Sequence, residues 1–136
     1  MKRREILLIA LFFVFLSLEG LQLTINAVGF SGKGKAIVII FEEGQKFKAS
    51  CENCLQKSVQ IEDGQIKAVF DSLSTKHYAV MVYHDENQNG KMDTNFFGMP
   101  KEGVGVSNNS GGIPSFKKSK FILKRDKEIQ IEMKYL

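Results

Sequence analysis

The sequence predicts an all-β protein folded as an antiparallel β-sandwich of about seven strands. Apolar and polar residues alternate with a period of two in several short runs, which is typical of strands with one buried face. Clusters of Gly, Asn, Asp and Ser separate these runs. There is no long run with helical apolar spacing. Two stacked antiparallel sheets are the usual way to bury such half-apolar strands, and a small barrel is the alternative.

The first strands are expected soon after residue 20. Residues 21–27 alternate apolar and polar side chains, so one face of this strand should be buried. Residues 36–41 are apolar on both faces, which suits a central strand. Residues 44–57 are mainly polar around two cysteines, and an irregular crossing or a short helix is expected there.

Three further strands are expected before residue 85. They cover residues 59–61, 66–70 and 77–84. The turn at 62–65 separates the first two, because its central Asp-Gly pair favours a chain reversal. The strongest of the three is 77–84, since six consecutive apolar or aromatic residues follow its first histidine, His77, which we expect to be exposed.

The rest of the chain combines a long loop with two strands. Residues 85–115 are expected to be irregular, and a loop of this length in one domain is usually either functional or disordered. Strands are expected at 121–123 and at 129–135, where Ile, Ile, Met and Tyr alternate with polar residues. A basic stretch overlaps this region, and it contains Lys117, Lys118, Lys120, Lys124, Arg125 and Lys127. A charged edge strand is the expected explanation, and contact with anionic lipid or polysaccharide is the alternative.

The N-terminus resembles a secretory signal peptide. Three basic residues precede the apolar run 6–18, which is shorter than the roughly 20 residues needed to span a bilayer. We therefore expect residues 1–20 to be removed, leaving residues 21–136 as one extracytoplasmic domain without a stable membrane span, in the periplasm, at the cell surface or secreted. An uncleaved anchor is the alternative. Removal leaves 16 basic and 13 acidic residues, and a charge of +3 is too small to indicate nucleic acid binding.

The two cysteines, Cys51 and Cys54, form one Cys-x-x-Cys pair. A zinc site needs four ligands, and neither a second Cys pair nor a His pair follows. In an oxidising compartment we expect a disulfide, with redox activity or thiols that are reduced or bind metal as alternatives. Such a short loop should contribute little to stability, because it removes little entropy from the unfolded chain.

The residues after the strongest strand have the spacing of a calcium-binding loop. Side-chain oxygens stand at relative positions 1, 3, 5 and 9, which are Asp85, Asn87, Asn89 and Asp93. Position 6 is Gly90, and position 7 is Lys91, which could offer its backbone carbonyl. Position 12, usually Glu, is Phe96, so a remote ligand is needed, and Glu102 is the first candidate. The expected cofactor is calcium, bound weakly with a Kd of about 10⁻⁴–10⁻³ M. The alternative is a metal-free type I′ turn at Asn89-Gly90.

Two classes of function fit these residues. The first is a non-enzymatic binding or structural module of the cell envelope, with or without calcium, whose partner is an envelope protein or a glycan. The second is a metal-assisted hydrolase or isomerase that uses His84, Asp85 and Glu102. Neighbouring strand side chains point to opposite faces, which argues against a hydrogen-bonded His84–Asp85 pair.

The middle third of the chain carries four further motifs, which are His84-Asp85, Asn87–Lys91, the Asn-x-x-Gly-x-Pro-x-Glu-Gly segment at 95–103, and Ser107-Asn108. Through these motifs the chain resembles the bacterial domain of unknown function family 2141. The resemblance extends over about residues 21–136. It implies an exported domain with an immunoglobulin-like or transthyretin-like sandwich, and it implies no established activity. The cysteine pair is not part of the family pattern.

Overall fold

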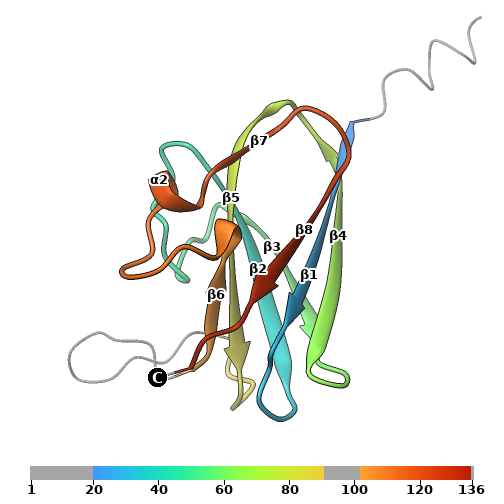
Figure 1. Ribbon diagram of the computed structural model, residues 1–136, viewed down its shortest axis with the longest axis vertical. Coiled ribbons are helices and arrows are strands. Elements are labelled where there is room, and N and C mark those ends of the chain that lie inside the picture. The colour runs from blue at the N-terminus through green and yellow to red at the C-terminus, as the bar shows by residue number, and fades with distance from the viewer. Residues whose placement is uncertain (1–19, 91–101, 136) are drawn as a thin grey trace, which may run out of the picture.

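Two β-sheets pack face to face in the computed structural model, which describes residues 20–90 and 102–135 (Figure 1). One sheet has the order β4-β1-β8, and the other has the order β3-β2-β5-β6, with β7 also paired to β5. The strands are β1 Leu21–Val28, β2 Lys35–Glu42, β3 Leu55–Gln60, β4 Gln65–Leu73, β5 Lys76–Asp85, β6 Val104–Val106, β7 Phe121–Leu123 and β8 Lys127–Glu132. The predicted all-β sandwich is confirmed. The expected signal peptide lies outside the described residues, except for Gly20.

The smaller sheet joins the two ends of the described chain. Its central strand, β1, pairs antiparallel with β4 and parallel with β8, with Ile25 opposite Ile129 and Ala27 opposite Ile131. The sheet is therefore mixed rather than purely antiparallel. Period-two alternation is the same in both kinds of pairing, so the sequence pattern could not distinguish them.

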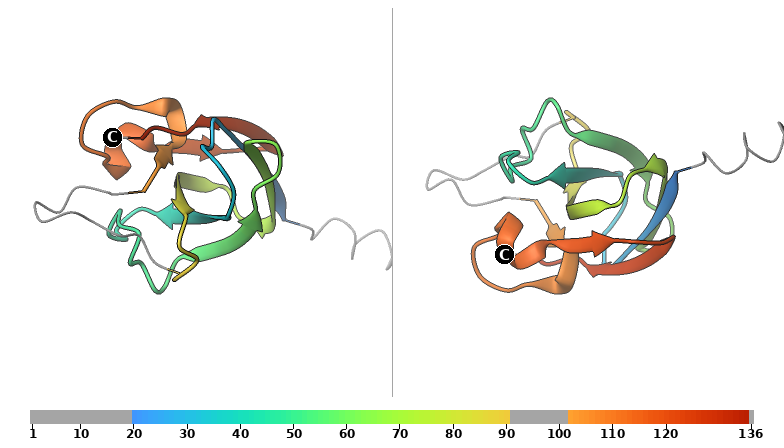
Figure 2. Two further views of the ribbon diagram at one scale, coloured as in Figure 1. Left: turned by 90° about the horizontal axis from the view of Figure 1, so that it is seen from below. Right: turned by 90° about the horizontal axis from the view of Figure 1, so that it is seen from above.

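The larger sheet is apolar on both faces, as the continuous apolar runs in β2 and β5 predict. Its inner face packs against the smaller sheet through residues such as Val38, Val80 and Val82. Its outer face carries a second apolar cluster built from Ile37, Ile39, Phe41, Cys54, Met81, Tyr83 and Val106. Two covering segments, residues 43–54 and 110–119, lie on the same side of the molecule, away from β1 and β4 (Figure 2). Phe47 from the first and Phe116 from the second pack against this cluster.

The expected loop at 85–115 is wrong in its second half. Residues 104–106 form β6, which pairs with β5, and a 3₁₀ turn, η1 Ser107–Asn109, follows it. Gly105 interrupts the apolar alternation that would have indicated a strand. A glycine is needed because a Cβ atom there would lie 2.6 Å from Cγ2 of Ile131.

Two other predicted boundaries shift. Strand β3 begins at Leu55, inside the segment expected to be irregular. The sequence does not indicate this start, because the four strand residues before Val59 are all exposed and show no apolar alternation. The last strand, β8, covers Lys127–Glu132 rather than the expected 129–135. Ile131 and Met133 are nevertheless buried, as the alternation predicts. Within the described residues, no helix has the length and apolar character needed to cross a membrane.

Candidate functional site at the end of strand β5

His84 lies on the inner face of the larger sheet and is fully buried. Its Nε2 lies 2.7 Å from the carbonyl oxygen of Lys33, and its Nδ1 lies 2.8 Å from the hydroxyl of Tyr135. A carbonyl oxygen can only accept, so Nε2 carries a proton, and in the neutral ring Nδ1 accepts from Tyr135. The Tyr135 oxygen also accepts from the Ser31 amide at 3.0 Å. His84 therefore ties the β1–β2 turn and the C-terminal segment to β5.

Asp85 is only 2% exposed, and its carboxylate closes the loop that follows β5. Its Oδ1 accepts from the Asn89 amide at 3.2 Å, and its Oδ2 accepts from the Gly90 amide at 2.8 Å. The Asn89 amide also lies 3.2 Å from Oδ1 of Asn87. Three of the expected ligand residues therefore converge in one turn, because short polar side chains accept from amides a few residues further on.

The backbone of this turn differs from a type I′ hairpin. Type I′ requires positive φ at both central residues. Here the positive φ values are 55° at Gln88 and 78° at Gly90, and Asn89 does not have one. The alternative of a type I′ turn at Asn89-Gly90 is therefore wrong, and the loop instead wraps around the Asp85 carboxylate.

Glu102 brings a second buried carboxylate to the same end of β5. It is 7% exposed, and its Oε2 accepts from the Glu86 amide at 2.6 Å. The Tyr83 hydroxyl donates to the Gly90 carbonyl oxygen at 3.2 Å. Burial, followed by the negative charges of Asp85 and Glu102, raises the pKa of Tyr83 to about 12. The remote ligand expected from the sequence thus lies close enough to share an electrostatic environment with Asp85.

The donor set consists of hard oxygens, which is the chemistry that calcium prefers. Asp85, Asn87, Asn89 and Glu102 lie within the described residues, whereas Lys91 and Asp93 lie outside them. In the part of the chain that the structure describes, no group of three His, Cys, Asp or Glu side chains is arranged to hold a metal. The described residues therefore supply two carboxylates and two amide side chains, and by themselves they do not form a metal site.

The alternative catalytic set is divided between two faces. His84 faces the inner core with both ring nitrogens engaged, whereas Asp85 bonds to backbone amides on the other side of β5. His84 is more deeply buried than the strand-end position expected for it. The exposed position expected for His77 is confirmed.

The Ser107-Asn108 motif has a role that sequence reasoning missed. Ser107 Oγ accepts from the Val80 amide at 2.9 Å and donates to the Ser119 carbonyl oxygen at 2.6 Å. Asn108 has a φ of 63°, and its Nδ2 donates to the carbonyl oxygen of Lys118 at 3.1 Å. The motif therefore joins β5 to the short helix α2, Phe116–Ser119. The Ser-Asn pair was visible in the sequence, but its partners are remote in the chain.

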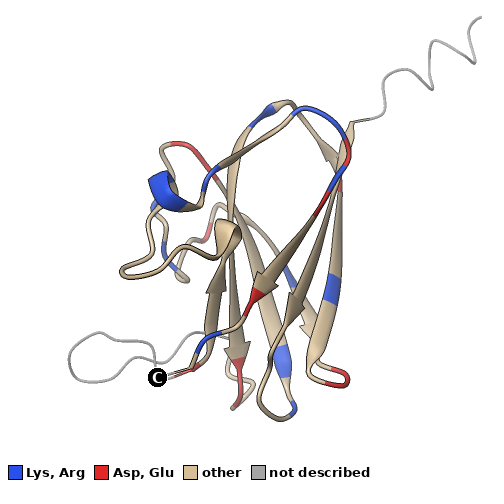
Figure 3. Ribbon diagram, in the orientation of Figure 1, with Lys and Arg blue, Asp and Glu red and all other residues tan. Residues whose placement is uncertain are grey.

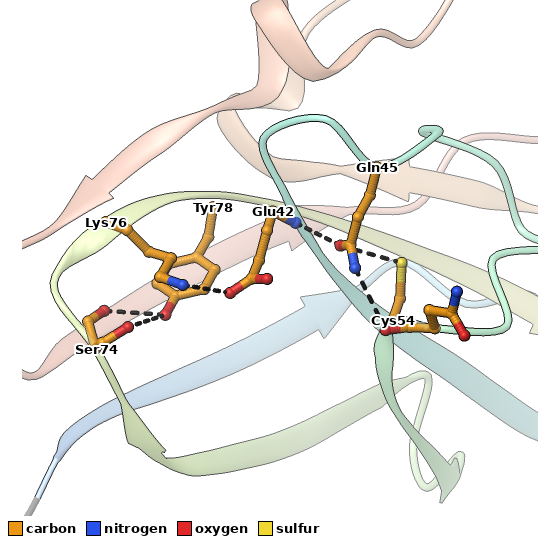
Figure 4. A network of polar contacts seen from close by, with 7 residues as sticks. Glu42, Gln45, Cys54, Ser74, Lys76 and Tyr78 are labelled. Atoms are coloured by element: carbon orange, nitrogen blue, oxygen red, sulfur yellow. Dashed lines mark hydrogen bonds and ion pairs between the residues drawn. The ribbon is translucent and has the colours of Figure 1, made fainter.

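The expected disulfide joins Cys51 to Cys54, whose Cα atoms are 5.6 Å apart. Gln45 stabilises the turn beside it (Figure 4). Its Oε1 accepts from the Glu42 amide at 2.7 Å and lies 3.3 Å from Sγ of Cys54, while its Nε2 donates to the Asn53 carbonyl oxygen at 3.3 Å. These contacts hold the 43–54 segment against the outer apolar cluster.

The same figure shows how the neighbouring β4–β5 turn is fixed (Figure 4). Lys76 Nζ lies 2.8 Å from Oε1 of Glu42, and the Tyr78 hydroxyl donates to the Ser74 carbonyl oxygen at 2.9 Å. The hydrogen bond and charge of Glu42 raise the pKa of Lys76. This exposed ion pair contributes little to stability, since solvent screens it.

Comparison with known proteins gives one family match. The family model described as "Uncharacterized protein conserved in bacteria (DUF2141)" matches residues 26–132, which include every site residue described above except Tyr135. Neither the comparison with curated proteins nor that with solved structures gave a match.

Proposed function

The chain belongs to the bacterial DUF2141 family, and on that premise we propose that it is an exported, non-enzymatic module of the cell envelope in which a calcium ion orders the loop after β5. The observation that carries this proposal is the buried Asp85 carboxylate, around which the loop folds and near which Glu102 returns. Export rests on the signal-like pattern of residues 1–20.

Electrostatics favours a cation at this end of β5. Removing carboxylates from water is costly unless they are paired or hydrogen-bonded, and two neighbouring negative charges add repulsion. Backbone amides offset part of this cost for Asp85 and Glu102. A divalent ion would offset more of it. The proposed ligands are Asp85, Asn87, Asn89, the carbonyl of Lys91, Asp93 and Glu102.

The ion would have a structural role. Calcium takes six to eight oxygen ligands in a flexible arrangement, which suits a loop that leaves a rigid strand and returns to it. A loop ordered in this way on a rigid sandwich can present a binding surface to an envelope protein or glycan. Both ends of the loop, Asp85 and Glu102, are fixed by hydrogen bonds to backbone amides.

Thermal unfolding in calcium and in chelator tests the proposal. Calcium at about ten times its Kd should stabilise the folded state by about 1.4 kcal/mol and raise Tm by several degrees. Calcium should also slow proteolytic cleavage within residues 91–101. Identical Tm values and cleavage rates in calcium and in chelator would contradict the proposal.

Matched variants locate the effect. Asp85→Asn and Glu102→Gln each remove a ligand charge with little change in size, so each should abolish the calcium-dependent rise in Tm. Asp63→Asn is the control, because Asp63 is exposed in the β3–β4 turn and its φ of 53° suits Asn equally well. A calcium effect that survives in Asp85→Asn would place the ion elsewhere.

A further inference from the structure

Residues 110–120 form a basic projection with an apolar tip, beside the larger sheet (Figures 1 and 3). Ile113 at the tip is 84% exposed, compared with 54% for Leu55, the next most exposed large apolar residue in the described chain. It stands between Gly112 and Pro114, and a Cβ atom added at Gly111 would meet nothing within 4 Å. The tip therefore stands clear of the rest of the fold.

One lysine holds its ammonium group beside this tip. Lys118 Nζ donates to the carbonyl oxygens of Gly111 at 3.5 Å and Ile113 at 3.4 Å. Gly112 has a φ of 72°, which lets the backbone turn back toward that group. A positive charge and an exposed isoleucine are thus fixed next to each other.

The base of the projection is rigid. Phe116 packs against the outer apolar cluster, and Ser119 is fully buried, with its carbonyl oxygen accepting from Ser107. With these two residues turned inward, the three lysines of the segment are exposed, namely Lys117, Lys118 and Lys120. Figure 3 shows the ribbon of α2 in blue, the colour of its lysines.

The projection has no acidic neighbour in the sequence and no ion pair among the described residues. The sequence contains no Asp or Glu between Glu102 and Asp126. Among the described residues, Lys117, Lys118 and Lys120 form no ion pair. The prediction of a charged edge strand is wrong for these three residues, because the first two lie on α2 and the third follows it. Protection of a sheet edge therefore does not explain them.

We propose that the 110–120 projection is a contact site for an anionic lipid bilayer. Ile113 enters the boundary between headgroups and acyl chains, while Lys117, Lys118 and Lys120 contact the anionic headgroups. An acidic polysaccharide would use the same ammonium groups but would leave Ile113 in water, so the apolar tip favours the bilayer. The contact uses no residue of the proposed calcium site and is independent of it.

Fluorescence at the tip tests this contact directly. The chain contains no Trp, so Ile113→Trp introduces a single reporter at a site exposed enough to accept it. With phosphatidylglycerol vesicles in chelator and low salt, its emission should shift to the blue and be quenched by brominated lipid. High salt should reverse both effects. Leu55→Trp is the control and should show neither effect, even if residues 1–20 hold the chain at the vesicle.

Charge variants complete the test. Adding Lys117→Gln and Lys120→Gln to Ile113→Trp should weaken vesicle binding about 25-fold, at roughly fivefold for each lysine near an anionic surface. Adding Lys35→Gln and Lys67→Gln, which alter exposed lysines on strands β2 and β4, should leave it unchanged.

Four results would overturn the proposal. They are no blue shift with phosphatidylglycerol, an equal shift with phosphatidylcholine, a shift that appears only with calcium, and lysine-dependent binding to dextran sulfate without a shift on vesicles. The last would assign the projection to an anionic glycan.

Discussion

Tyr83, His84 and Asp85 are consecutive residues at the end of β5, and their side chains alternate between two environments. His84 lies in the sandwich core, where its ring is bonded to Tyr135 and to the Lys33 carbonyl. Tyr83 and Asp85 lie on the opposite face, beside the loop that closes on Gly90. The strand thus separates the buried hydrogen bonds of His84 from the Asp85 carboxylate and the loop around it.

The raised pKa of Tyr83 predicts a loss of stability at high pH. The ordinary pKa is 10.0, and burial with the charges of Asp85 and Glu102 raises it to about 12 in the folded protein. Between these two values the unfolded chain releases the proton while the folded chain keeps it. The free energy of unfolding should therefore fall as pH rises from 10 to 12. Below pH 10 both states keep the proton, so this group causes no change of stability with pH there.

Urea unfolding across this pH range measures the effect. Tyr83→Phe should reduce the slope of stability against pH, because it removes the titrating group. Asp85→Asn should lower the pKa of Tyr83, which absorbance at the tyrosinate wavelength reports. Equal slopes for wild type and Tyr83→Phe would disprove the assignment.

At the scale of elements, the 43–54 segment has no regular secondary structure, yet it completes the outer apolar cluster. Phe47 stacks edge-on against Phe41, with ring centroids 4.7 Å apart, and Cys54 is buried beside them. The disulfide closes only a short loop, and Gln45 already ties the turn to β2. The segment is therefore held by packing and hydrogen bonds as well as by the covalent link.

The double variant Cys51→Ser, Cys54→Ser should lower the free energy of unfolding by about 2 kcal/mol at most, because a short loop removes little unfolded-state entropy. Urea unfolding of the variant and of reduced wild type measures this. The two should agree within a few tenths of a kcal/mol. A loss of several kcal/mol would mean that the disulfide, rather than packing, holds the segment in place.

Strands with a buried face were predicted more accurately than strands that are exposed. Strands with one or two buried faces, such as β1, β2 and β5, were predicted close to their observed bounds because their apolar patterns are clear. The start of β3 was missed, since an edge strand exposed on both faces has no such pattern. Strand β6 was missed because its central residue is a glycine required by the close approach of Ile131.

At the scale of the whole molecule, the sandwich depends on pairing between its first and last strands. Strand β1 is central in the smaller sheet, and β8 supplies one of its two neighbours. Ile131 on β8 is fully buried in the main core, opposite Ala27. The C-terminal segment continues from β8 to Tyr135, which contacts His84.

Ile131→Ala should lower the free energy of unfolding by about 2–5 kcal/mol, the usual cost of a large cavity in a core. Ile122→Ala is the matched control, because Ile122 is exposed on β7 and should change stability by less than about 1 kcal/mol. Urea unfolding at neutral pH compares the two. Equal losses would show that β8 is not part of the cooperative core.

The candidate site was predicted only where its residues are close in sequence. Asp85, Asn87 and Asn89 follow a spacing that can be read directly, and Glu102 was chosen because a loop must return to the sheet. Tyr135 was not predicted as the partner of His84, because 51 residues separate them and strand order decides their contact. Local spacing carries no information on strand order.

The parallel pairing of β1 with β8 also sets the time at which the domain can form. During synthesis β1 leaves the ribosome long before residues 127–132, so the nascent chain holds β1 with one of its edges unpaired until β8 has emerged. Throughout that interval the smaller sheet lacks a third of its strands. The smaller sheet can therefore be completed, and its open edge withdrawn from chaperones, only after β8 has emerged.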